Sequence, residues 1–449
     1  LKWYFPTHLS PLSVSILKLK KLRSLNLEIR TRDIGAEGSK LLYRIGLIKE
    51  LRELKLTFDQ RTSCHLFNIL SGSIHRLKKL TFFSLFLIFD DHAPEINCQN
   101  LFTGLEKLTN LNELQLEVKP MGTSDILSFA GLMKNLKELK RFNTRFNLFS
   151  TDAEDAFIVF INTLQQMEGL EELSLVVSLG NYLEGKCIEK LARALDDHLG
   201  NLHTFYFSVL NYGFDYQTIE FLRRVILKKK KLKKLSLEFP SHFQSDEDKI
   251  MVFPQCRIES PLEEFKTSLY SYFGDLIGTF SKLKKISLSI NSLQNKHLLT
   301  IGDALKNLHE LETLLFVFFR SATEGTQTGM ASICESLKYL KNLEEINWLF
   351  WRVDFDDQCL IKIGKLIGRL AKFQELIFFM QGNPMITFDG INTFLSDITE
   401  WKKLKYLKIN FWNLEKVNLH DSNWGIIEQV VNKIKATKTV SISTRSILK

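Results

Sequence analysis

The sequence predicts an α/β solenoid, in which short strand–helix units stack so that their strands form one parallel sheet. One phrase, apolar-x-x-apolar-x-apolar, recurs fourteen times along the 449 residues. The copies follow one another about every 29 residues, and a fixed period of this size is typical of stacked repeats. Between the copies lie segments whose apolar residues have helical spacing. A unit this small cannot bury its apolar face alone, so we expect neighbouring units to cover it.

The repeated phrase predicts the strands, because its apolar residues alternate with polar ones as they do in a strand with one buried face. Twelve full copies begin at Leu22, Leu51, Leu77, Leu111, Leu170, Leu202, Leu232, Leu283, Leu311, Leu343, Phe373 and Leu404. Two degenerate copies lie at Leu136/Leu139 and at Leu262/Phe265.

Three of the segments between the copies show helical spacing clearly. They contain Gly185, Ile188, Leu191 and Leu195; Met330, Ile333 and Leu337; and Leu360, Ile363, Leu366 and Leu370. The pair Gly35 and Gly38 resembles a phosphate-binding loop only superficially, since its spacing is wrong, and we interpret it as a helix start.

The chain is predicted to be a single repeat domain, residues 1–449, with about fourteen repeats from 22 to 412. Proline and acidic residues near 240–261 indicate an irregular repeat or an insertion. Residues 413–449 are predicted to form a C-terminal cap, with a helix from Trp424 to Ile434 and a last strand from Thr439 to Ser443. Since the chain opens with Leu1 rather than Met, we expect it to be a piece of a longer protein.

The period and the phrase resemble those of leucine-rich repeat proteins of the ribonuclease-inhibitor-like type. The resemblance covers roughly residues 22 to 412. It implies a curved horseshoe with a parallel sheet on its concave face, helices on its convex face, and recognition of other proteins. The Asn that follows the strand in that family is present at Asn291 and almost nowhere else. Phenylalanine is frequent, with 35 residues, so we expect aromatic side chains in the interior.

Composition excludes several classes of protein. With 45% apolar and 25% charged residues the chain is not disordered, and a net charge of +9 is small for a nucleic-acid binder of this length. The longest apolar stretch, Phe82 to Phe89, is too short for a membrane span. No catalytic motif, metal-ligand spacing or cofactor loop occurs. We therefore expect a non-enzymatic cytoplasmic protein without metal or cofactor.

Local clusters of reactive side chains are interpreted as structural. The Asp-Asp-His runs at Asp90 and Asp196 are expected to be solvated turns rather than metal sites. Cys187, Cys334 and Cys359 lie on predicted helices and are expected to pack as small apolar groups. The basic run 228–234 is expected to be a solvated loop, and contact with an acidic protein, a phosphoinositide or RNA is the alternative.

The alternate positions of the early strands are predicted to line the concave face with polar side chains. Glu113, Glu138 and Glu172 belong to consecutive copies and are expected to stand side by side, which is unfavourable unless a cation lies between them. Lys137 and Lys140 could supply it, and a basic partner is the alternative.

The alternate positions of the late strands are apolar, so the concave face is predicted to be apolar there. Seven apolar side chains alternate with inward residues on three neighbouring strands: Leu315, Val317, Phe319, Leu349, Trp351, Ile377 and Phe379. Soluble proteins rarely expose a contiguous patch of this kind, and aromatic residues are typical anchors of binding sites. The alternatives are that tight curvature or a folded-over terminus buries these strands, or that their register differs.

The sequence therefore predicts a scaffold that docks a protein of unidentified nature on its concave face. One alternative is the recognition region of a larger enzyme or adaptor, such as a kinase or ubiquitin-ligase subunit, whose other domain lies before Leu1. GTPase-activating and nucleic-acid-binding repeat proteins are less favoured, since the C-terminal segment is basic and no aromatic residues alternate with the lysine run.

Overall fold

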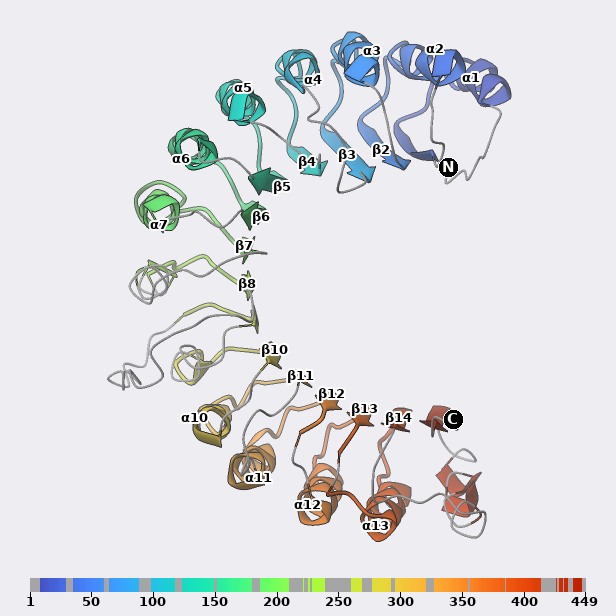
Figure 1. Ribbon diagram of the computed structural model, residues 1–449, viewed down its shortest axis with the longest axis vertical. Coiled ribbons are helices and arrows are strands. Elements are labelled where there is room, and N and C mark those ends of the chain that lie inside the picture. Colours follow the sequence, from blue (N-terminus) through green and yellow to red (C-terminus); the bar gives the residue numbers. More distant parts are fainter. Residues whose placement is uncertain are drawn as a thin grey trace. The chain divides into compact units, whose positions relative to one another are not determined.

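In a computed structural model of the protein, the chain divides into two compact units, Leu1–Leu232 and Lys233–Lys449. The structure describes residues 9–29, 35–59, 64–88, 98–117, 123–148, 152–179, 186–209, 221, 225–226, 228–238, 260–268, 277–291, 295–319, 327–353, 356–383, 385–412, 425, 428–430, 432–434 and 439–445. In each unit, parallel strands alternate with helices, and the helices lie on one side of the strands (Figure 1). The predicted α/β repeat fold is confirmed.

The described residues of the first unit form seven parallel strands in sequence order, β1 to β7. Its strands are β1 (Ser24–Ile29), β2 (Glu53–Asp59), β3 (Phe82–Ile88), β4 (Glu113–Glu117), β5 (Arg141–Leu148), β6 (Glu172–Leu179) and β7 (Thr204–Val209). Its helices are α1 (Ser10–Ile16), α2 (Gly35–Ile45), α3 (Cys64–Ile74), α4 (Gln99–Leu105), α5 (Thr123–Met133), α6 (Ala153–Leu164) and α7 (Lys186–Asp197). Gly35 begins α2, as predicted.

In the second unit the part of the chain that the structure describes forms eight parallel strands, again in sequence order. They are β8 (Lys234–Glu238), β9 (Glu264–Thr267), β10 (Lys285–Asn291), β11 (Thr313–Phe319), β12 (Glu345–Trp351), β13 (Glu375–Gln381), β14 (Tyr406–Trp412) and β15 (Thr439–Arg445). The helices are α10 (Asn295–Leu305), α11 (Gln327–Ser336), followed by a 3₁₀ turn (Leu337–Tyr339), α12 (Asp357–Ile367) and α13 (Phe388–Thr399).

The fourteen copies of the phrase correspond to β1 to β14, but two copies have a different register from the one predicted. In β3 the buried residues are Phe83 and Leu85, three positions beyond those expected. In β5 the phrase begins at Leu139 and continues with Phe142. The reason is that these two repeats carry one more buried apolar residue in the turn before the phrase, Leu77 and Leu136. That residue offers an equally good start of the phrase in the sequence alone.

Hydrogen bonds from side chains join each repeat to its neighbour. Asparagines in the turns before three strands donate to backbone carbonyls of the preceding repeat: Asn110 to Lys78 (3.0 Å), Asn201 to Glu168 (2.9 Å) and Asn342 to His309 (2.9 Å). These asparagines lie at the opposite end of the strand from the family position at Asn291. They satisfy backbone groups that would otherwise be orphaned at the repeat boundary.

The start of α13 is held in the same way. Thr387 caps α13, and its backbone N–H and hydroxyl both donate to Asp357 of α12, at 2.9 and 2.6 Å. Gly390 passes so close to this carboxylate that an added Cβ would lie 2.0 Å from Asp357 Oδ1. Only glycine fits there, so the packing of α12 against α13 depends on this position.

Aromatic residues fill much of the interior, as the phenylalanine content predicted. In the first unit Phe160 lies within 5.0 to 5.8 Å of the ring centroids of Phe129, Phe146 and Phe157. In the second unit the rings of Phe316 and Trp348 stack at 5.9 Å. These contacts add to the free energy of apolar burial.

Several predictions concern residues that are only partly described. The run that begins at Asp90 and most of the segment from Pro240 to Pro261 lie outside the described residues. The described positions between 425 and 434 are helical, and β15 pairs with β14 in parallel, as expected for the predicted cap. The single-domain assignment of residues 1–449 stays a prediction. None of the described helices combines the length and the apolar composition needed to cross a lipid bilayer.

Candidate interaction surface

The seven predicted side chains come together on three adjacent strands of the second unit, and we call them the apolar patch. In the register of β11, β12 and β13, Val317 lies beside Leu349, which lies beside Phe379. Phe319 lies beside Trp351 in the next row. Leu315 and Ile377 flank Asn347 in the row before.

The patch faces away from the helices. Along β11 the residues between its members, Leu314, Phe316 and Phe318, are completely buried. The same alternation holds along β12 and β13, where Phe378 contacts Phe394 of α13 at 5.5 Å. The patch members keep part of their surface accessible, and Trp351 is 47% exposed. The predicted register of these strands is therefore confirmed.

Ring contacts order the patch. The rings of Phe319 and Trp351 lie 6.0 Å apart at 49°. The ammonium group of Lys408, on β14, lies 5.2 Å from the centre of the Phe379 ring, within the range of a cation–π interaction. Rings that are already held in place lose little conformational freedom when a partner binds.

Three polar atoms beside the patch have no hydrogen-bond partner among the described residues: Asn347 Oδ1, Asn410 Oδ1 and Trp412 Nε1. Each belongs to the side of the sheet that carries the patch, because its position alternates with buried residues of the same strand. All three atoms are shielded from solvent. A shielded polar atom without a partner costs about 1 to 3 kcal/mol.

Four glutamates lie where these same strands begin, and we call them the acidic strip: Glu312, Glu344, Glu345 and Glu375. Their backbones are hydrogen-bonded across the strands, since Glu344 and Glu345 donate to Glu312 and Glu375 donates to Glu344, at 2.8 to 3.0 Å. Among the described residues, their carboxylates accept two long side-chain bonds, from Gln374 to Glu344 (3.4 Å) and from Thr313 to Glu345 (3.5 Å).

No carboxylate of the acidic strip forms an ion pair within the described part of the chain. Lysines flank the strip on both sides, with Lys284 and Lys285 beside Glu312 and Thr313, and Lys405 beside Gln374. None of these three lysines forms an ion pair with a carboxylate of the strip among the described residues. The strip is therefore confined to the three strands that carry the apolar patch.

The opposite end of the patch is basic. Arg352, which follows β12, has a φ of 52° and is exposed. Gly382 holds the same position after β13 with a φ of 62°, and an added Cβ there would lie 3.1 Å from Cγ of Arg352. A left-handed conformation costs glycine little, whereas it costs arginine about 1 kcal/mol.

The prediction that three glutamates stand side by side on the early strands is wrong. Glu138 does not lie between Glu113 and Glu172, because the register of β5 places Arg141 there. Arg141 Nε lies 2.7 Å from Glu113 Oε2, and this hydrogen bond raises the pKa of Arg141. Arg145 and Glu117 form a second pair, at 3.1 Å. The predicted row of like charges is therefore an alternating one.

The basic run 228–234 contacts neighbouring repeats. Lys228 Nζ lies 3.2 Å from Asp196 Oδ2, Lys231 donates to Asn201 (2.6 Å), and Lys234 pairs with Glu264 (3.0 Å). Lys229 is buried, and burial lowers its pKa. Lys228, Lys231 and Lys234 are exposed, as expected for a solvated segment, whereas the burial of Lys229 differs from that expectation. Contact with an acidic partner stays an untested alternative.

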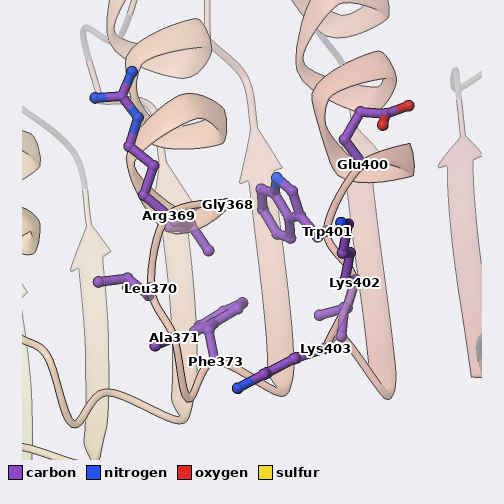
Figure 2. A pocket seen from close by; sticks show the side chains of 11 residues that line it. Gly368, Arg369, Leu370, Ala371, Phe373, Glu400, Trp401, Lys402 and Lys403 are labelled. Carbon is purple, nitrogen blue, oxygen red and sulfur yellow. The ribbon is translucent and has the colours of Figure 1, made fainter.

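A small hollow lies beside the turns that follow α12 and α13, with a volume of about 230 Å³ (Figure 2). Trp401 and Phe373 line it, and Arg369, Lys402 and Lys403 are exposed at its rim. It is smaller than the roughly 300 Å³ at which ligand pockets begin.

The predicted helical cysteines, Cys187, Cys334 and Cys359, are buried free thiols. Burial raises the pKa of Cys187 to about 12, so its thiol is protonated at neutral pH. A hydrogen bond with Cys359 and burial raise the pKa of Cys334. Within the described ranges no three His, Cys, Asp or Glu side chains lie close enough together to hold a metal ion.

Sequence reasoning located the apolar patch but missed the acidic strip and the unpartnered polar atoms around it. The strip had a signal, since a glutamate directly precedes the second apolar residue of the phrase at Glu345 and Glu375. The molecule is a strand–helix repeat protein with a partly apolar open face. Neither the known protein families nor the curated proteins contain a match to this chain.

Proposed function

We propose that this chain is a non-enzymatic scaffold of the leucine-rich repeat, ribonuclease-inhibitor-like type, which docks a partner protein on the apolar patch. The observation that carries the proposal is the contiguity of the seven patch residues on the side of β11 to β13 that no described helix covers. An apolar surface with ordered aromatic anchors gains free energy when a protein covers it.

The cellular setting and chain context are part of the proposal. Free thiols at Cys187, Cys334 and Cys359 are typical of a reducing compartment, so we propose that the interaction takes place in the cytoplasm. A role as the recognition region of a larger enzyme or adaptor is compatible with the same surface, because the docking chemistry would be unchanged.

A comparison of matched variants tests the proposal. Trp351→Ala combined with Phe379→Asp removes the centre of the patch. Leu299→Ser combined with Tyr339→Ala removes exposed apolar surface from α10 and the 3₁₀ turn, where the side chains are 37% and 39% exposed. Partners captured by the intact chain and identified by mass spectrometry should be lost with the first variant and retained with the second. Equal recovery with both variants would exclude the patch as the docking surface.

A further inference from the structure

We infer that the segment docked on the apolar patch carries a lysine or arginine within about four residues of its apolar anchor side chains, and that this basic residue binds the acidic strip. This inference rests on the proposed function, and it specifies the chemistry of the partner.

The acidic strip and the apolar patch lie on the same three strands. Glu312, Glu344, Glu345 and Glu375 lie at the starts of β11 to β13, the three strands that carry every patch residue. At other strand starts some carboxylates have cationic partners, as Glu113 has Arg141 and Glu264 has Lys234. The four carboxylates of the strip form no ion pair among the described residues, so a cation from a docked segment would give them the partner that Glu113 and Glu264 already have.

Repulsion between neighbouring carboxylates favours the binding of a cation at the acidic strip. Glu345 and Glu375 occupy the same register position on adjacent strands, and like charges so placed destabilise a sheet. A bound ammonium or guanidinium group removes that repulsion and gains charge-assisted hydrogen bonds. Binding is therefore favoured by relief of a cost that the free protein already carries.

The acidic strip lies within reach of a basic side chain on a segment that is docked on the apolar patch. Along a strand, Glu375 is two residues from Ile377 and four from Phe379, which corresponds to roughly 7 and 13 Å at the usual rise. Three strands span about 10 Å from first to last, which matches the width of one helix or one extended segment. A basic side chain within four residues of the anchors reaches the strip in either conformation.

The charges at the two ends of the surface favour one orientation of the docked segment. One end of the surface is acidic, and the other carries the exposed Arg352. This gradient favours one direction for a segment whose basic end meets the strip. Since the chain as a whole carries a net charge of +9, a generally basic partner is repelled except at this site.

Selection from a random twelve-residue peptide display library tests the inference, with the intact chain as bait. We expect enrichment of peptides in which Lys or Arg lies within four residues of Leu, Ile, Phe or Trp. Glu345→Gln with Glu375→Gln should weaken the most enriched peptide by about tenfold, and raising the salt concentration should weaken it similarly. Glu53→Gln with Glu138→Gln, which removes two exposed carboxylates elsewhere, should leave its affinity unchanged.

The experiment distinguishes failure of the inference from failure of the proposed function. If the selected peptides bind through Trp351 and Phe379 but lack basic residues and tolerate Glu345→Gln with Glu375→Gln, the inference is overturned and the docking function stands. If no peptide depends on Trp351 and Phe379, the proposed function is overturned as well. If light scattering shows a dimer that Trp351→Ala dissociates, a second copy occupies the patch and the inference is wrong. Misfolding cannot mimic the expected loss, because the glutamine variants should unfold at the same or a higher denaturant concentration.

Discussion

The strands β4 to β6 and the strands β11 to β13 have the same buried positions but use their open face differently. On β4 to β6, Glu113, Arg141 and Glu172 alternate in charge across the strands. On β11 to β13, Glu345 lies beside Glu375 without a cation, and apolar side chains follow. The buried face must fit its helices in both regions, whereas the open face is free to differ. The difference indicates that function is to be sought on the open face.

The largest expected effect tests whether the two faces of a late strand differ as described. Trp348 is completely buried and Trp351, three residues later, is 47% exposed. Trp348→Ala should lower the free energy of unfolding by about 3 to 5 kcal/mol, because it leaves a cavity against Phe316. Trp351→Ala should lower it by less than about 1 kcal/mol. Urea unfolding of both variants measures the difference, and similar losses would contradict the register of β12.

A smaller effect should separate the two regions by their response to acid. Burial, with a contribution from Lys296, lowers the pKa of His297 on α10 to about 4. Between that value and the ordinary value of about 6.5, the unfolded chain binds a proton that the folded chain does not. Stability is therefore complete above pH 6.5 and falls by up to about 3 kcal/mol as the pH drops towards 4.

Hydrogen exchange measures this response locally. Amides of β11, which follows α10, should lose protection between pH 7 and pH 4.5, after correction for intrinsic exchange, by more than those of β5. His297→Gln should reduce that pH dependence, since it cannot be protonated. An unchanged dependence in this variant would assign the acid response to other groups.

The smallest effect concerns the charges themselves. A double-mutant cycle of Glu113→Gln and Arg141→Met should give a coupling of about 0.5 kcal/mol, because both side chains are partly exposed. Salt should reduce it. In the late region the sign is opposite, and Glu345→Gln should raise stability by a few tenths of a kcal/mol. Destabilisation by Glu345→Gln would show that the acidic strip has a partner within the chain.

The sequence was sufficient to predict the repeat, the parallel strand order and the exposed side of most strands. These follow from spacing, since burial on one face of a strand imposes a period of two. The apolar patch was predictable because β11 is apolar from Leu314 to Phe319, and because the positions between the buried residues of β12 and β13 are also apolar, apart from Asn347. Twelve of the fourteen copies have the register that the phrase predicts.

Two features could not be predicted from the sequence. One is which of two possible starts of the phrase sets the register of a strand, and the other is which polar side chains pair with one another. In β3 and β5 an apolar residue three positions upstream offers an equally good start, and only the ladder to the neighbouring strand decides. Whether Glu113 has Arg141 or a lysine as its partner depends on that frame. The lack of a partner for Glu345 likewise depends on side-chain distances across strands.

The last strand has a consequence for any shortened form of the protein. β15 pairs with β14 along all seven residues, from Tyr406 to Trp412. A chain that stops before Thr439 would leave one edge of β14 with open backbone donors and acceptors. Such an edge invites pairing with another chain. Expression fragments that end within residues 413–438 are therefore at risk of aggregating through β14, even though every residue of the apolar patch is retained.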